Sequence, residues 1–127
     1  MPELLGDLQL QVMDVVWRLG RATVADVHQA IAERRRIAYT TVLTTLRALE
    51  RRGIVRHDKA GKAFVYRPAM TRDQYTAATV GKVVDDLFEG RKEGLLCHIL
   101  GAERIGKDDM AEIRRLVGRR NDKEAKP

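Results

Sequence analysis

The first half of the chain repeats apolar residues at intervals of three and four over three consecutive segments, residues 7–19, 23–35 and 38–53. This spacing places the apolar side chains along one side of an α-helix, so it predicts three amphipathic helices that pack on one another. The stripe predicted to be buried in the third helix consists of Val42, Leu46 and Leu49.

The apolar period changes after residue 53. Residues 54–57 and 63–67 are short runs of strand-favouring residues, and they flank a turn predicted at residues 60–61. This pattern predicts a β-hairpin. Two lysines lie at its tip, Lys59 and Lys62.

Three helices followed by a basic-tipped hairpin predict a mainly α fold with a small β-hairpin wing. The N-terminal domain, residues 1–70, is then a winged helix-turn-helix, a fold that presents its third helix to the major groove of DNA.

The side of the third helix opposite the apolar stripe is polar. Thr40, Thr44, Arg47 and Arg51 are spaced by four, three and four residues, which places them on one face, and Thr41 and Thr45 flank that face. Threonine disfavours helix interiors, so four threonines in two turns call for a reason. Short hydroxyls can bond phosphate oxygens or base edges, which predicts a DNA-binding face. The alternative is that these threonines only cap the helix and face water.

The C-terminal half predicts a helical dimerisation domain over residues 71–120, followed by a charged and disordered tail over residues 121–127. Thr71 and Gln74 form a capping-box pattern at the start of its first helix. A unit this small is marginal alone, so its apolar faces favour a homodimer. The alternative is that this half packs on its own winged helix. The residues expected to support dimerisation are Tyr75, Val83, Val84, Leu87, Phe88, Leu95, Leu96 and Ile99.

Charge and composition narrow the function. The net charge is +6, and residues 1–70 carry +5 of it, which favours a polyanion such as double-stranded DNA as partner of that half. An ordinary basic surface is the alternative. The single cysteine, Cys97, supplies neither a disulfide framework nor a multi-cysteine metal site. No signal peptide or membrane span is visible, so we expect a cytoplasmic protein without direct membrane binding. No phosphate loop or catalytic set is visible either, so we expect no enzyme, cofactor or metal.

Four stretches resemble the BlaI/MecI penicillinase-repressor family, in its order and spacing: "LGDLQLQVMDVVW", "TVADVHQAI", "AYTTVLTTLRALERRGIV" and "GKAFVYRP". The resemblance implies a dimeric winged-helix repressor that binds a palindromic operator, often with TACA/TGTA half-sites. Such operators lie upstream of β-lactamase or related antibiotic-resistance genes, and frequently of the repressor's own gene. Thr41 and Thr44 match the family's recognition-helix threonines, while the family's arginine position holds Ala48 here and the arginine lies one residue earlier, at Arg47.

The resemblance also implies relief of repression by proteolysis. In the family, a membrane sensor-transducer metalloprotease cuts the dimerisation domain, typically at an Asn-Phe bond. The equivalent bond here is His98-Ile99. A copper-responsive branch of the family uses a C-terminal cysteine motif, which Cys97 alone does not supply.

Two other functions are compatible with parts of the pattern. A winged helix can serve protein–protein contact, although such a domain has no need of aligned threonines and arginines. A ligand- or metal-responsive regulator is the third reading, and the sequence alone shows no candidate pocket for it.

Overall fold

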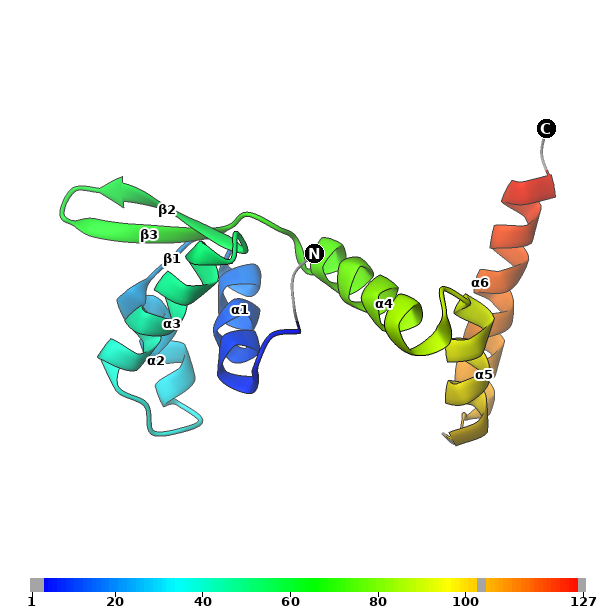
Figure 1. Cartoon of the computed structure of the whole chain (residues 1–127). Helices are drawn as coiled ribbons and strands as arrows, with labels where there is room; N and C mark the ends of the chain where they lie inside the picture. The colour runs from blue at the N-terminus through cyan, green and yellow to red at the C-terminus, as the bar shows by residue number, and fades with distance from the viewer. Residues whose placement is uncertain (1–3, 103–104, 126–127) are drawn as a thin grey trace. The chain divides into compact units, whose positions relative to one another are not determined.

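The computed structural model describes the chain from residue 4 to residue 125, except residues 103 and 104. Contacts divide it into two compact units, residues 1–82 (unit 1) and 83–127 (unit 2). The elements, drawn in Figure 1, are α1 (Asp7–Leu19), β1 (Ala22–Thr23), α2 (Val24–Ala32), α3 (Tyr39–Arg51), β2 (Val55–Ala60), β3 (Ala63–Pro68), α4 (Arg72–Phe88), α5 (Lys92–Ala102) and α6 (Lys107–Ala125).

The core of unit 1 lies where α1, α2 and α3 pack together and against the sheet. The stripe predicted for the third helix is confirmed, because Val42, Leu46 and Leu49 are completely buried. Burial of each such side chain contributes roughly 1.5–3 kcal/mol. The other side chains that are at most 1% exposed are Val12, Met13, Val16, Ala22, Val27, Ile54, Val55 and Tyr66.

Local hydrogen bonds set where α2 begins. The Thr23 hydroxyl accepts a bond from the Asp26 backbone N–H (3.1 Å), and the Asp26 carboxylate accepts one from the Thr23 N–H (3.0 Å). This reciprocal pair satisfies two of the N–H groups that a helix start leaves open. α1 instead begins after Gly6 in extended conformation, so Asp7 is its first residue.

α2 ends at Ala32, earlier than the predicted end at residue 35. The backbone N–H groups of Arg34 and Arg35 both donate to the Ile31 carbonyl, which closes the last turn tightly. Residues 34–36 are consecutive arginines, and cations at this point suit the negative C-terminal end of the helix dipole. The segment from residue 33 to residue 38 therefore connects α2 to α3.

The sheet is antiparallel with strand order β1-β3-β2. Ala60 pairs with Ala63, so the turn falls on Gly61 and Lys62, one residue later than predicted. Gly61 has φ +64°, a conformation that glycine adopts without strain. β1 was not predicted, because two residues are too few to show a period; Ala22 pairs with Tyr66 and ties the helices to the hairpin. The winged helix-turn-helix prediction is confirmed.

Tyr75 corrects the predicted assignment to the dimerisation surface. Its side chain is only 6% exposed, its hydroxyl accepts a bond from the Leu5 N–H (2.9 Å), and its ring centroid lies 5.7 Å from that of Trp17. The Trp17 indole N–H donates to the Met70 carbonyl (2.9 Å). The start of α4 thus packs in the core of unit 1, and the division between units falls inside α4, later than residue 70.

Within α4, the predicted capping box is present: the Thr71 hydroxyl accepts from the Gln74 N–H (3.0 Å) and the Gln74 side chain accepts from the Thr71 N–H (2.9 Å). Unit 2 contains the end of α4, α5 and α6. α6 continues to Ala125, where a disordered tail from residue 121 was predicted. The helix ends on one lysine, one glutamate and one alanine, residues 123–125, and these residue types favour helix without an apolar stripe. Residues 126 and 127 of the predicted tail lie outside the described part.

Candidate nucleic-acid interface

The polar face predicted on α3 is exposed. Thr40, Thr41, Thr44, Arg47 and Arg51 all lie at the surface of the helix, opposite its buried stripe. Neither arginine has an ion-pair partner within the described residues. Two guanidinium groups without carboxylates on a face lined with hydroxyls form a surface that attracts phosphate.

Thr45 does not belong to this face, which corrects its predicted place in the DNA-binding set. It is 9% exposed, and its hydroxyl donates to the Thr41 carbonyl (2.7 Å). One helical position separates Thr45 from Thr44, and that rotation of about 100° turns it toward the core. The internal hydrogen bond satisfies its hydroxyl there.

The remaining threonines differ in what they can offer DNA. The Thr44 hydroxyl donates its hydrogen to the Thr40 carbonyl (2.8 Å), so toward solvent it can only accept. An acceptor suits the amino group of adenine or cytosine in the major groove. The hydroxyls of Thr40 and Thr41 have no intramolecular partner among the described residues, so they remain able to donate to phosphate.

The start of α3 carries no side-chain cap. Its N-cap residue is Ala38, and no acidic residue lies in the first turn. The Thr41 and Val42 N–H groups reach the Ala38 carbonyl, which leaves the N–H groups of Tyr39 and Thr40 for an external acceptor. The alternative reading had the threonines cap this helix and face water: none of them caps it, while Thr40, Thr41 and Thr44 do face solvent. The positive end of the helix dipole is open to an anion.

Tyr39, the first residue of α3, is a further exposed residue beside the polar face, and the sequence analysis did not include it. Its side chain is 48% exposed, and its ring lies edge-on to that of His28, with centroids 5.9 Å apart. The His28 Nε2 lies 2.8 Å from the Ile37 carbonyl oxygen, so this histidine makes a structural contact at the edge of the core. The signal available in the sequence was the position of Tyr39, directly before Thr40 and Thr41 at the start of the helix.

The hairpin carries Lys59 and Lys62, both exposed as predicted, and Figure 1 shows it extending beyond the helices of unit 1. Arg56 on β2 is a further exposed cation that the sequence reasoning did not single out. Its neighbour across the sheet, Arg67, donates to the Asp58 carboxylate (3.0 Å). The charge of Arg67 is therefore paired within the hairpin.

The base of the hairpin is tied to α3. The His57 Nδ1 lies 2.7 Å from a Glu50 carboxylate oxygen, and the His57 ring contacts the Phe64 ring at a centroid separation of 4.5 Å. Tyr66 lies buried beneath, and its pKa is raised by burial and by the Glu50 carboxylate, against a smaller lowering by Arg47. These contacts hold the hairpin and the exposed face of α3 in a fixed relation.

Comparison with known proteins agrees with this geometry. The sequence model of the penicillinase repressor family matches residues 5–119. The chain belongs to the penicillinase repressor family. Its members are transcriptional repressors, and the relatives below are named as regulators or repressors.

This repressor-family chain is 38% identical over 118 residues to the transcriptional regulator BlaI of Mycobacterium tuberculosis, covering 89% of this chain and 82% of that protein. It is 20% identical over 113 residues to the penicillinase repressor of Bacillus licheniformis, and the match covers 89% of this chain and 88% of that protein. The B. licheniformis BlaI monomer, solved in complex with the blaP half-operator, is 27% identical with a TM-score of 0.51, covering 59% of this chain and 92% of that one. The solved DNA-binding domain of the repressor BlaI is 27% identical in sequence with a TM-score of 0.52, and the match covers 59% of this chain and 94% of that one.

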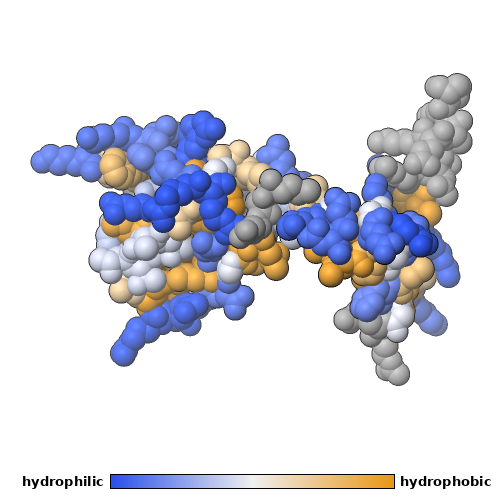
Figure 2. All heavy atoms as spheres, viewed as in Figure 1, coloured by the Kyte–Doolittle hydropathy of each residue, from blue (hydrophilic) through white to orange (hydrophobic). Residues whose placement is uncertain are grey.

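In unit 2 of this repressor-family chain, the residues predicted for dimerisation differ in exposure. Leu87, Leu96 and Ile99 are 73%, 45% and 42% exposed, whereas Val84 is 5% exposed. Val83, Phe88 and Leu95 are half-buried. Figure 2 shows apolar atoms at the surface among hydrophilic ones on this unit. Three further exposed apolar residues of this unit lie outside the set predicted for dimerisation: Leu100, Leu116 and Val117.

The predicted cleavage bond, His98-Ile99, lies inside α5 with both residues exposed. Cys97 is an exposed free thiol beside it. No cluster of potential metal ligands occurs among the described residues. None of the helices in the described part is long and apolar enough to span a membrane.

Proposed function

We propose that this chain represses transcription as a homodimer bound to a palindromic operator, and that it does so in the cytoplasm. The observation that carries the proposal is the exposed face of α3, where hydroxyls, unpaired arginines and an uncapped helix start lie together beside a basic hairpin. The 27% identity to a BlaI domain solved with its half-operator supports it.

Each subunit inserts α3 into one major groove. Thr40, Thr41 and Thr44 face the base edges, since they occupy the N-terminal turns, the part of a recognition helix that enters the groove. Arg47 lies one turn beyond Thr44 on the same exposed face, and its longer side chain extends to the base edges from there. Arg51 lies at the far end of the helix and contacts the backbone. Lys59 and Lys62 hold flanking phosphates from the wing.

The dimer forms through unit 2. Leu87, Leu96 and Ile99 expose apolar surface on a unit too small to bury it internally, and a second copy supplies the complementary surface. Two linked DNA-binding units then gain avidity on a site with two half-sites.

The regulated genes are of the β-lactamase or related type, together with the repressor's own gene. Relief of repression follows cleavage by a membrane sensor-transducer metalloprotease at His98-Ile99. Because the bond lies within helix α5, the protease requires local unfolding of that helix. Cutting there divides the apolar surface of unit 2 and so weakens the dimer.

A footprint of the purified chain on DNA upstream of its own gene, repeated at increasing salt, tests the proposal. We expect protection of a dyad, with affinity falling steeply as salt rises because phosphate contacts release counterions. Diffuse binding without a protected dyad at low salt contradicts it. The family's β-lactamase operators form a second set of probes, which separates an incorrect target from a failure to bind DNA.

A further inference from the structure

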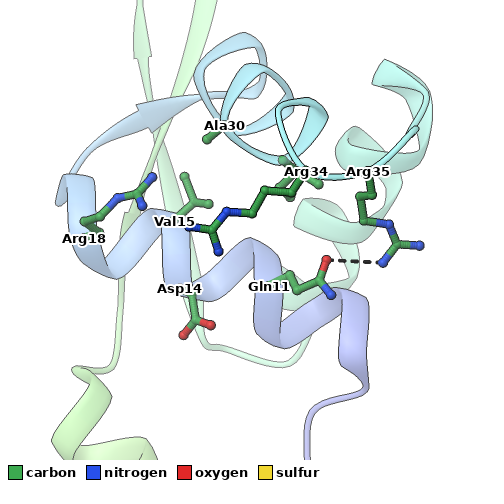
Figure 3. Close-up of a pocket in the computed structure, with 8 residues that line it drawn as sticks. Gln11, Asp14, Val15, Arg18, Ala30, Arg34 and Arg35 are labelled. Atoms are coloured by element: carbon green, nitrogen blue, oxygen red, sulfur yellow. Dashed lines mark hydrogen bonds between the residues drawn. The ribbon is translucent and has the colours of Figure 1, made fainter.

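A groove of ≈ 330 Å³ lies between α1 and the end of α2 in unit 1. It contains no residue of α3 or of the hairpin, so the DNA-binding proposal does not use it. Figure 3 shows its lining side chains. They are Gln11, Asp14, Val15 and Arg18 from α1, Ala30 and Ile31 from α2, and Arg34 and Arg35 from the connection to α3.

The floor of the groove is apolar. Val15 and Ile31 are 7% and 5% exposed and belong to the core of unit 1, while Ala30 is half-buried against it. The small side chain of Ala30 leaves room between the two helices. Such a floor favours a hydrocarbon or aromatic body, whose burial removes apolar surface from water.

The rim of the groove is cationic. Arg18, Arg34 and Arg35 are exposed, and Figure 3 shows the Arg34 side chain lying over the groove between the other two. Arg35 donates to the neutral Gln11 side chain (3.2 Å). Within the described residues, neither Arg18 nor Arg34 forms an ion pair.

Asp14 is the one carboxylate in this lining, and its charge is matched elsewhere. Its carboxylate accepts a bond from Arg72 at 2.7 Å, and Figure 3 shows it pointing away from Arg34. Asp26 and Glu33 border the neighbouring depression that shares Arg18, and neither pairs with it in the described structure. Three like charges therefore surround an apolar hollow, and an anion would relieve their repulsion.

We propose that this groove binds a small amphipathic organic anion. Its carboxylate or phosphate ester head is held by the Arg18 and Arg34 guanidinium groups, which suit planar, forked recognition of such oxygens. Its apolar body covers Val15, Ala30 and Ile31. A cavity of ≈ 330 Å³ is at the lower end of the size of small-molecule sites, which favours a small molecule over a peptide segment. The proposal does not depend on the operator or on dimerisation.

The groove lies beside the connection between α2 and α3, so a bound ligand would contact that connection. Arg34 and Arg35 belong to the connection that leads to Ala38, the N-cap of α3. A ligand held by Arg34 would contact the segment that places the start of α3.

The test is a titration of the isotope-labelled full chain, followed by backbone amide NMR signals. The probes are 4-phenylbutyrate, phenyl phosphate, the neutral 4-phenylbutanol and inorganic phosphate. We expect one or both aromatic anions to shift the α1 and α2 signals beside the groove and to bind about tenfold more tightly than the alcohol, because charge-assisted bonds form only with the anion. The two anions distinguish a carboxylate from a phosphate head. Inorganic phosphate, which lacks the apolar body, should bind more weakly than the aromatic anion that binds.

Three variants assign the binding. Arg34→Gln removes a rim charge, and Ala30→Leu fills the hollow without changing charge. Each should weaken binding of the aromatic anion about tenfold. Arg114→Gln in α6, an exposed arginine without an ion pair in the described structure, is the matched control and should leave binding unchanged. Equal binding of the alcohol, an equal loss in Arg114→Gln, or shifts confined to unit 2 would overturn the proposal.

Discussion

Four hydroxyl groups lie in the first two turns of α3, and their neighbours give them different roles. Thr45 is buried and bonded to the backbone, Thr44 is exposed but has donated its hydrogen, and Thr40 and Thr41 are exposed without an intramolecular partner. The sequence identified the group of threonines correctly as unusual. The helical period also separates them, because Thr45 lies three residues after Val42 and four before Leu49, on the buried side of the helix.

The buried position of Thr45 leads to a first prediction. Thr45→Val removes a hydroxyl whose only described bond is to a helix carbonyl, so operator affinity should stay within about twofold of wild type and stability should change by less than about 1 kcal/mol. Parallel operator titrations and urea unfolding measure both. Thr44→Val is the matched variant one residue away, and it should weaken operator binding. Equal losses in the two variants contradict the separation of roles.

Substitutions of Arg47 and Lys62 should change DNA binding in different ways. Arg47→Ala removes a candidate base contact and should change which half-site sequences are preferred. Lys62→Ala should weaken all sites alike and reduce the salt slope of binding by about one, as expected for one lost phosphate contact. Affinity for an operator set with single base changes, at several salt concentrations, distinguishes them. A uniform loss in both variants would show that Arg47 does not read bases.

At the scale of elements, the start of α3 lacks a stabilising N-cap bond, and this leaves its backbone N–H groups open to an anion. Ala38 provides no cap, so Ala38→Asp should stabilise the fold by about 1 kcal/mol through a new N-cap bond. The same carboxylate should repel phosphate and weaken operator binding. Ala38→Ser is the control, because it supplies a cap without charge. Thermal unfolding and operator titration together check this, and unchanged affinity in Ala38→Asp argues against phosphate at this helix end.

Tyr66 links the wing to α3 and gives a prediction for alkaline pH. Its pKa is raised above 10.0 in the folded state, chiefly by burial. Below pH 10 the phenol is neutral in both states and its contribution is fully present. As pH rises above 10, the unfolded state loses its proton first, so the free energy of unfolding should fall. Urea unfolding from pH 8 to pH 11 measures this, and Tyr66→Phe should show a shallower fall if Tyr66 is responsible.

At the scale of the whole molecule, the exposed apolar surface of unit 2 is expected to hold two copies together. Leu87→Asp places a charge on a side chain that is 73% exposed, so the subunit should still fold while the dimer weakens. Leu19→Asp, at 47% exposure in unit 1, is the matched control. Sedimentation should show a monomer only for Leu87→Asp, with more than about tenfold weaker binding to a full dyad and little change on a half-site. Dimers that persist in Leu87→Asp would place the interface elsewhere.

The sequence by itself determined the three helices, the hairpin and the polar face of α3, because each rests on a local period of apolar and polar residues. It also placed the capping box at Thr71 and Gln74, whose bonds span three residues. The tertiary structure alone decided the place of Tyr75 in the core of unit 1, the β1 strand and the cationic groove between α1 and α2. These depend on contacts between residues far apart in the chain, such as Leu5 with Tyr75 and Ala22 with Tyr66, and no local period records such contacts.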